Sequence, residues 1–155
     1  MKKVNLKTIE IAEAYKLLAE PKYQKLNDED KVKLWKISRK LAPIALKYEE
    51  EKLDANKKLM PDDPEFPQKL QKAAQYENIK LGKESGELPI TDEEYREIAK
   101  IFSEFNSLLK KALSELEEKE ESIEIEPLSE EALGKLMDSN NWTFKQIDAI
   151  AFIVE

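Results

Sequence analysis

Two pairs of acidic residues have the spacing that brings carboxylates together on one face of a helix. They are Glu10 with Glu13 and Glu51 with Asp54. Residues three positions apart are neighbours on a helix surface, and carboxylate oxygens are ligands that Mg²⁺ prefers in proteins. If the two helices faced each other, the four carboxylates would form a magnesium site able to assist phosphoryl chemistry.

This spacing resembles that of the all-helical nucleotide pyrophosphatases, which carry a Glu-x-x-Glu pair followed by a Glu-x-x-Asp pair. The resemblance implies magnesium-dependent release of pyrophosphate from a nucleotide. The two pairs stand much farther apart here than in that family, and a chain with 33 Asp and Glu residues contains such pairs by chance. We therefore keep this enzyme as the least favoured interpretation; in the other interpretation, both pairs are solvated helix faces.

Other catalytic classes lack their residues. The chain has no histidine and no cysteine, so it has neither the commonest general base nor a thiol nucleophile, and it lacks most ligands of transition metals. It also has no Gly-rich phosphate loop, no serine nucleophile elbow and no acidic calcium loop. We predict a protein that is not an enzyme, with no cofactor and no metal, and we infer no small-molecule substrate.

The clearest structural pattern is a heptad repeat in the second half of the chain. Alternating steps of three and four residues connect Tyr95, Ile98, Phe102, Phe105, Leu109, Ala112 and Leu116. This spacing is typical of a helix that packs lengthwise on another helix. Residues 91–94 form a capping box, so we expect this helix to begin there and to end near Lys119.

A second long helix is predicted over residues 28–59, with Asn27 as its N-cap. Its own apolar seam comprises Leu34, Ile37, Leu41, Ile44 and Tyr48. Pro43 lies inside the helix, so we expect a kink or a break there. Three of the seven prolines lie within residues 61–67, which predicts a hairpin tip near residues 60–67 and a third helix over residues 67–79.

Strand patterns occur near the two ends of the chain. Residues 2–7 and 122–126 alternate apolar with polar or charged residues, and we expect them to pair as a ribbon with glutamates opposite lysines. Thr8 is the expected cap of a short helix over residues 9–19.

Two short helices are predicted after the second strand, capped by Ser129 and Thr143, to complete a C-terminal segment over residues 122–155. The apolar end that contains Ile150 and Ile153 is expected to dock on the bundle or on another subunit.

Together these patterns predict a single helical domain over residues 1–155. We expect an all-α fold with a long antiparallel helical hairpin or small bundle, coiled-coil-like, and a minor two-stranded β-ribbon joining the region of the termini. No apolar run approaches the roughly 18 residues that cross a bilayer, and no hydrophobic block follows the first lysines. We therefore expect neither a membrane span nor a signal peptide, and a cytoplasmic location.

The charge of the chain is unevenly distributed. Residues 1–60 carry 15 Lys and Arg against 10 Asp and Glu, whereas residues 61–155 carry 11 against 23. This asymmetry favours pairing between the two halves, within one chain or between two copies. A rival interpretation is a nucleic-acid-associated regulatory protein that uses the basic stripe of the second helix: Lys33, Lys36, Lys40 and Lys47, beside Trp35 and Arg39. The net charge of −7 disfavours it, because an acidic protein repels phosphate.

Aromatic residues at seam spacing more often pack in a core than contact a ligand. We expect this of Trp35, Phe102 and Phe105. If a seam or the apolar C-terminal end closes between subunits instead, the residues that contact the partner are Phe102, Phe105, Leu109, Leu116, Trp35, Ile150 and Ile153. The heptads leave open whether the seams close within one chain or across a dimer.

The order of these parts resembles small uncharacterised helical proteins of bacteriophages and prophages. The resemblance rests on the Met-Lys-Lys-Val-x-Leu start, the long helix with Ile37 to Leu41 and Tyr48 to Lys52, the second long helix and the acidic Ile-Glu-Ile strand. It implies an accessory or assembly protein with no catalytic residues to carry over. We therefore predict a non-catalytic interaction or assembly protein that binds itself or a protein partner through helical surfaces.

Overall fold

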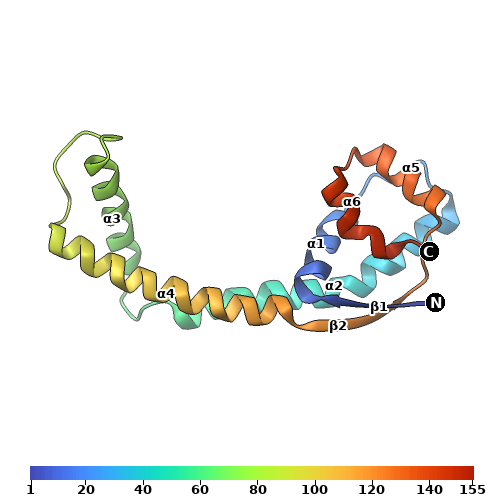
Figure 1. Cartoon of the computed structure of the whole chain (residues 1–155), viewed down its shortest axis with the longest axis horizontal. Coiled ribbons are helices and arrows are strands. Elements are labelled where there is room, and N and C mark those ends of the chain that lie inside the picture. The colour runs from blue at the N-terminus through green and yellow to red at the C-terminus, as the bar shows by residue number, and fades with distance from the viewer. The chain divides into compact units, whose positions relative to one another are not determined.

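A computed structural model describes all 155 residues, Met1 to Glu155. The fold is mostly helical (68%, six helices), with a small two-stranded antiparallel sheet, which confirms the predicted class at this level. In chain order the elements are β1 (Lys2–Lys7), α1 (Thr8–Leu18), α2 (Asp28–Leu59), α3 (Phe66–Lys80), α4 (Asp92–Glu118), β2 (Glu120–Ile125), α5 (Glu130–Asn140), α6 (Phe144–Ile150) and a 3-10 turn (Ala151–Ile153) (Figure 1). The lengthwise hairpin of the two long helices stays a prediction.

The chain divides into two compact units. Unit 1 comprises residues 1–53 and 114–155, and unit 2 comprises residues 54–113. The prediction that the two units together form a single domain stays a prediction. None of the helices combines the length and the apolar composition that a membrane-spanning helix requires.

The ribbon of unit 1 has the predicted partners. Strands β1 and β2 pair antiparallel, with Lys3 opposite Glu124 and Lys7 opposite Glu120. Opposite charges on facing positions of a ribbon stabilise its register. An ion pair of 2.7 Å between Lys7 Nζ and Glu118 continues this arrangement past the end of the sheet. The prediction of glutamates opposite lysines is confirmed.

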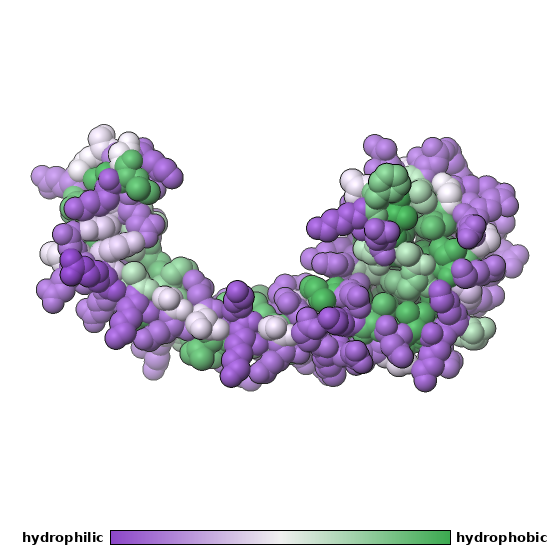
Figure 2. Space-filling model, in the orientation of Figure 1, coloured by the Kyte–Doolittle hydropathy of each residue, from purple (hydrophilic) through white to green (hydrophobic).

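The core of unit 1 draws on nearly every element of the unit. Its buried residues come from α1, α2, β2, the α5 region and the C-terminal end, and they include Ile11, Leu18, Ile37, Leu41, Ile125, Leu128, Leu136, Ile150 and Ile153. Figure 2 shows apolar side chains filling the space between α5 and α6 on one side and α1 and α2 on the other. The apolar C-terminal end therefore docks within its own chain, as one of the two predicted possibilities.

Thr8 does not cap α1, so this prediction is wrong. Thr8 is the first residue of the helix and is buried. Its backbone N–H and its Oγ1 hydroxyl both donate to the carbonyl of Lys119, each at 2.8 Å. The N-cap is Lys7, whose backbone N–H donates to Glu10 Oε2 at 2.7 Å. The Thr8 hydroxyl therefore bonds to Lys119, which is distant in sequence, instead of capping the helix.

Helix α2 is continuous through Pro43, so the break does not occur. The kink, which was the other predicted alternative, stays a prediction. Proline removes one hydrogen bond from the helix interior, but packing on both sides can offset that loss. Here Leu41 and Ala45, on either side of Pro43, are both buried in unit 1. The predicted cap is confirmed, since the backbone N–H of Asp30 donates to Asn27 Oδ1 at 2.8 Å.

Unit 2 is held by a pair of stacked tyrosines. The rings of Tyr76 on α3 and Tyr95 on α4 have centroids 4.4 Å apart and planes 15° apart. The Tyr76 hydroxyl donates to Asp92 and the Tyr95 hydroxyl donates to Glu77, so both bonds join α3 to α4. These bonds lower the pKa of Asp92 and raise the pKa of each tyrosine.

The predicted third helix and the capping box that begins α4 are confirmed.

Tyr48 joins α2 to the last turn of α4 within unit 1. Its side chain is buried, and its hydroxyl donates to Glu117 Oε1 at 3.2 Å. Burial, together with the negative charge of Glu117, raises the pKa of the Tyr48 phenol to about 12. The folded protein therefore holds this proton more tightly than the unfolded chain, whose tyrosines titrate near pH 10.

This pKa difference predicts a loss of stability in alkali. A raised pKa in the folded state contributes stability below about pH 10 that disappears as the pH rises through about 12. We expect the free energy of unfolding, measured with urea at several pH values, to fall less steeply over this range in Tyr48→Phe than in the wild type. Tyr23→Phe, at an exposed tyrosine, should follow the wild type. An equal slope in Tyr48→Phe and the wild type would contradict the assignment.

Candidate interaction surface

The predicted seam of α4 is largely covered by the chain itself. Phe105 is only 6% exposed and Ile98 is also buried, while Leu109 and Leu116 are half-buried. Phe102 is 38% exposed, with its ring centroid 6.4 Å from that of Phe105. Most of this seam therefore contributes to packing within the chain. Phe102 is exposed, so the expectation that it packs in a core is wrong.

The other predicted contact residues separate into two groups. Ile150 and Ile153 are fully buried in the core of unit 1, where no partner can reach them. Trp35, in contrast, is 58% exposed, so the expectation that it packs in a core is wrong. Successive residues of a helix differ by about 100° in direction. Trp35 therefore points away from the buried face that its neighbour Leu34 occupies.

Trp35 belongs to a second heptad pattern on the outer side of α2. We call this set the outer stripe; its members are Val32, Trp35, Arg39, Ala42, Leu46, Glu49 and Leu53. The large apolar members are well exposed: Val32 by 49%, Leu46 by 59% and Leu53 by 64%. Helix α2 thus carries two apolar faces, of which unit 1 buries only one. The sequence contains a signal for this exposed face. The residues of the outer stripe follow the same steps of three and four residues as the buried seam, but they occupy other positions of the helix.

A groove opens beside the N-terminal end of the outer stripe. It has a volume of about 370 Å³, with Val32 and Trp35 on one side and Pro21 and Tyr23 on the other. The Arg39 guanidinium lies 5.4 Å from the centre of the Trp35 ring, a cation–π contact that holds the indole against the helix. Arg39 is not among the residues that line the groove, whereas Lys31 is, with its Nζ 5.9 Å from the centre of the Tyr23 ring. The walls therefore combine aromatic surface with the positive charge of Lys31.

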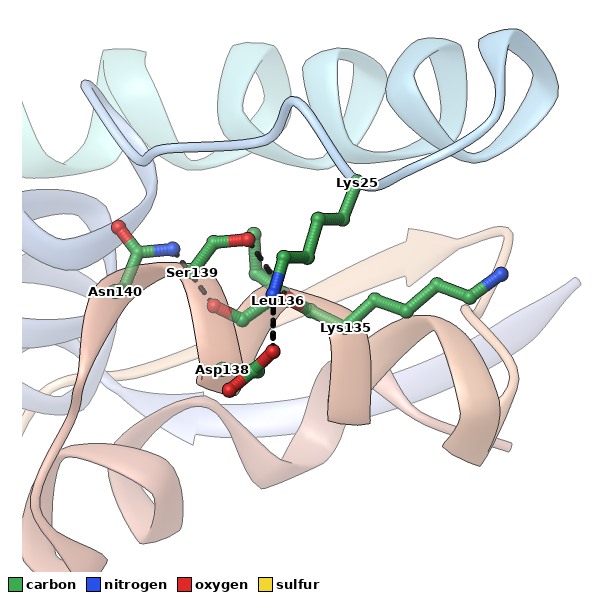
Figure 3. A network of polar contacts seen from close by, with 6 residues as sticks. All are labelled: Lys25, Lys135, Leu136, Asp138, Ser139 and Asn140. Carbon is green, nitrogen blue, oxygen red and sulfur yellow. Dashed lines mark hydrogen bonds and ion pairs between the residues drawn. The ribbon is translucent and has the colours of Figure 1, made fainter.

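The loop that forms the second wall is fastened to α5 (Figure 3). Asn140 Oδ1 accepts from the backbone N–H of Lys22 at 2.8 Å, and its Nδ2 donates to the Lys22 carbonyl at 2.7 Å. The same Nδ2 donates to the Leu136 carbonyl at 2.8 Å, as Figure 3 shows. Lys25 forms an ion pair with Asp138 and lowers the pKa of that carboxyl. One asparagine side chain therefore fixes the position of the loop against the helix.

The basic stripe of α2 is partly paired with neighbouring carboxylates. The Nζ atom of Lys33 lies 3.5 Å from Glu29 and 3.9 Å from Glu126. Lys47 lies 3.8 Å from Glu51, and Lys40 donates to the backbone carbonyl of Glu124. Lys36 alone of the four lysines has no such partner. Two of the four lysines therefore pair with carboxylates, whereas Lys36, Lys40 and Arg39 keep a positive charge that no carboxylate offsets.

The two acidic pairs do not assemble a metal site. Glu10 accepts the N-terminal hydrogen bond of α1, and Glu51 pairs with Lys47 on α2. No group of three or more acidic side chains in the structure is placed to hold a metal ion. The contacts of Glu10 and Glu51 are those of a helix cap and a surface ion pair.

Comparison of the chain with protein-family models, curated proteins and solved structures finds no match. We therefore infer the function from the exposed surface of α2 and from the groups that surround it.

The burial of Phe105 yields a prediction about the seam of α4. Truncation to alanine removes a buried aromatic ring and leaves a cavity, so Phe105→Ala should lower the free energy of unfolding by about 3 kcal/mol. The partly exposed Phe102 provides a matched control, for which we expect a loss of about 1 kcal/mol. Chemical denaturation measures both values. Equal losses would contradict the difference in burial.

The hydrogen bonds of the Asn140 side chain yield a second prediction. Asn140→Ala removes three hydrogen bonds at a half-buried position and should lower the free energy of unfolding by about 2 kcal/mol. The neighbouring Asn141 has a left-handed backbone (φ 53°) that glycine adopts freely. Asn141→Gly should therefore change the stability by less than about 0.5 kcal/mol. Urea unfolding measures the free energy of unfolding of both variants. A loss in Asn140→Ala alone assigns the effect to the hydrogen bonds of its side chain, whereas equal losses would mean that any substitution in this turn destabilises the protein.

Proposed function

We propose that this protein is a non-catalytic interaction or assembly protein that binds a helix along the outer stripe of α2. The observation that carries the proposal is the exposure of Val32, Trp35, Leu46 and Leu53 at heptad spacing on one continuous helix. Scattered exposed apolar residues are normal on a protein surface, but aligned ones are typical of an interface. Burial of one such side chain contributes about 1.5–3 kcal/mol.

The spacing of the stripe favours a helical partner. Steps of three and four residues keep side chains on one side of a helix over many turns, so a second helix can pack along them. The groove beside Trp35 adds a hollow into which one large side chain of the partner can fit. A folded helix supplies such side chains at a matching interval without the cost of ordering an extended peptide.

The other interpretations have less support. A nucleic-acid-associated function would rely mainly on Lys36, Arg39 and Lys40, since Lys33 and Lys47 already pair with carboxylates. The net charge of −7 disfavours it. A magnesium-dependent pyrophosphatase would need carboxylates that converge on one site, and Glu10 and Glu51 are engaged elsewhere. A phage or prophage origin, a cytoplasmic location and a coiled-coil-like hairpin of α2 and α4 stay predictions that fit an assembly protein.

Removal of two large side chains from the stripe tests this function. We expect Trp35→Ala/Leu46→Ala to weaken binding to a helical protein partner, foreign or a second copy, by at least about tenfold, because about 1.4 kcal/mol or more of apolar burial is lost. The partner is captured from an extract of the source cells, and its affinity is then measured with purified proteins. Self-association of the chain is measured in parallel.

The matched control is Phe144→Ala, which removes an apolar side chain that is 86% exposed on α6 rather than on α2. This variant should bind like the wild type. The proposal would be overturned if the stripe variant retained full affinity, or if the wild type bound neither itself nor any other protein.

A further inference from the structure

We infer that the helix bound by the outer stripe is the outer stripe of a second copy of this chain, running antiparallel. This inference rests on the proposed function and names its partner. It is carried by the order of side chains from Trp35 to Leu53 in the stripe, which is complementary to itself when reversed, and Val32 lies outside this matched segment. Such a match is what a two-fold symmetric interface between identical chains requires.

The register follows from the positions of the residues about Ile44. Arg39 and Glu49 stand five residues on either side of it, Ala42 and Leu46 two residues, and Trp35 and Leu53 nine residues. A two-fold axis at this level therefore places Arg39 opposite Glu49 of the second copy and Trp35 opposite Leu53 of the second copy. The smallest member, Ala42, meets Leu46 of the second copy, so a small side chain faces a large one in the two central layers.

Electrostatics select this orientation over the parallel one. The antiparallel pairing brings Arg39 of each copy to Glu49 of the other, whereas a parallel pairing would bring Arg39 to Arg39 and Glu49 to Glu49. Like charges at facing positions of a coiled coil disfavour pairing, and a single polar layer is enough to fix orientation. Beside the stripe, Lys36 and Glu50 stand seven residues on either side of Pro43, which places these opposite charges together as well.

The charged members of the stripe are accessible to a partner in the structure. The Glu49 side chain is 47% exposed, and its in-chain ion pair with Lys52 is long, at 3.7 Å. The Arg39 guanidinium lies over the Trp35 ring and keeps its hydrogen-bond donors free for a carboxylate. Arg39 and Glu49 of one chain are about 15 Å apart along the helix, so they reach each other only between copies. The stripe spans three heptads, about 33 Å.

The test uses the complete chain with one charge reversed at a time. Arg39→Glu and Glu49→Arg each place like charges in both polar layers of the dimer. In sedimentation equilibrium over a wide concentration range, we expect a wild-type monomer–dimer equilibrium whose midpoint shifts at least about tenfold upward in each single variant. An equimolar mixture of the two variants should regain the wild-type midpoint, because every polar layer then joins Arg to Glu.

The double variant Arg39→Glu/Glu49→Arg separates the two orientations. It restores opposite charges only in the antiparallel pairing and should dimerise like the wild type. Lys145→Glu, on α6, is the control for a charge reversal outside the stripe and should not shift the midpoint. Circular dichroism of each variant checks that the fold is retained.

The inference would be overturned by a wild type that stays monomeric at every concentration, or by a mixture that associates no better than its components. A monomer that still binds a foreign helix through Trp35 and Leu46 would overturn the second copy as partner and leave the proposed function standing. A monomer that binds no protein at all would overturn both.

Discussion

Helix α2 contributes one face to the hydrophobic core of unit 1 and exposes another face on the surface of the protein. Leu34, Ile37 and Leu41 are buried against α1, α5 and the C-terminal end, and this contact orients the helix about its own axis. Because a helix is a rigid cylinder, that orientation also determines which residues face outward. The exposure of Trp35 and the outer stripe is therefore a consequence of how the core of unit 1 is packed.

The polar contacts around this core mainly determine where the strands, helices and loops lie relative to one another within unit 1. The charge pairs of the ribbon fix its register, and the hydroxyl of Thr8 joins the start of α1 to the residue before β2. Asn140 does the same for the loop beside Trp35. Each of these contacts is modest in free energy, but each selects one arrangement among several that the apolar core would tolerate.

Local signals in the sequence predicted local structure well. The caps at Asn27, Thr91 and Ser129 are formed as expected, because a cap depends on residues within one turn of the helix. Thr8 departed from its prediction because its partner, Lys119, is more than a hundred residues away. At Pro43 the helix continues, so the predicted break does not occur, and buried residues on either side hold the helix together. For Thr8 a distant contact outweighed a local preference.

The candidate surface was harder to predict for a related reason. Periodicity identifies apolar faces of a helix, but it does not say which face the rest of the chain will cover. Helix α2 has two such faces, and the sequence favoured burial for Trp35, whose side chain is exposed in the structure. Ile150 and Ile153 show the converse, since the core of their own chain accounts for both.

The order in which the units occur along the chain has a consequence for folding during synthesis. Unit 2 consists of one uninterrupted segment, residues 54–113, whereas unit 1 needs residues from both sides of it. Strand β1 leaves the ribosome more than a hundred residues before its partner β2. The apolar face of residues 1–53 therefore lacks its partners from residues 114–155 while unit 2 can already form from nearer contacts. Chaperone protection of the nascent chain would matter most in that interval.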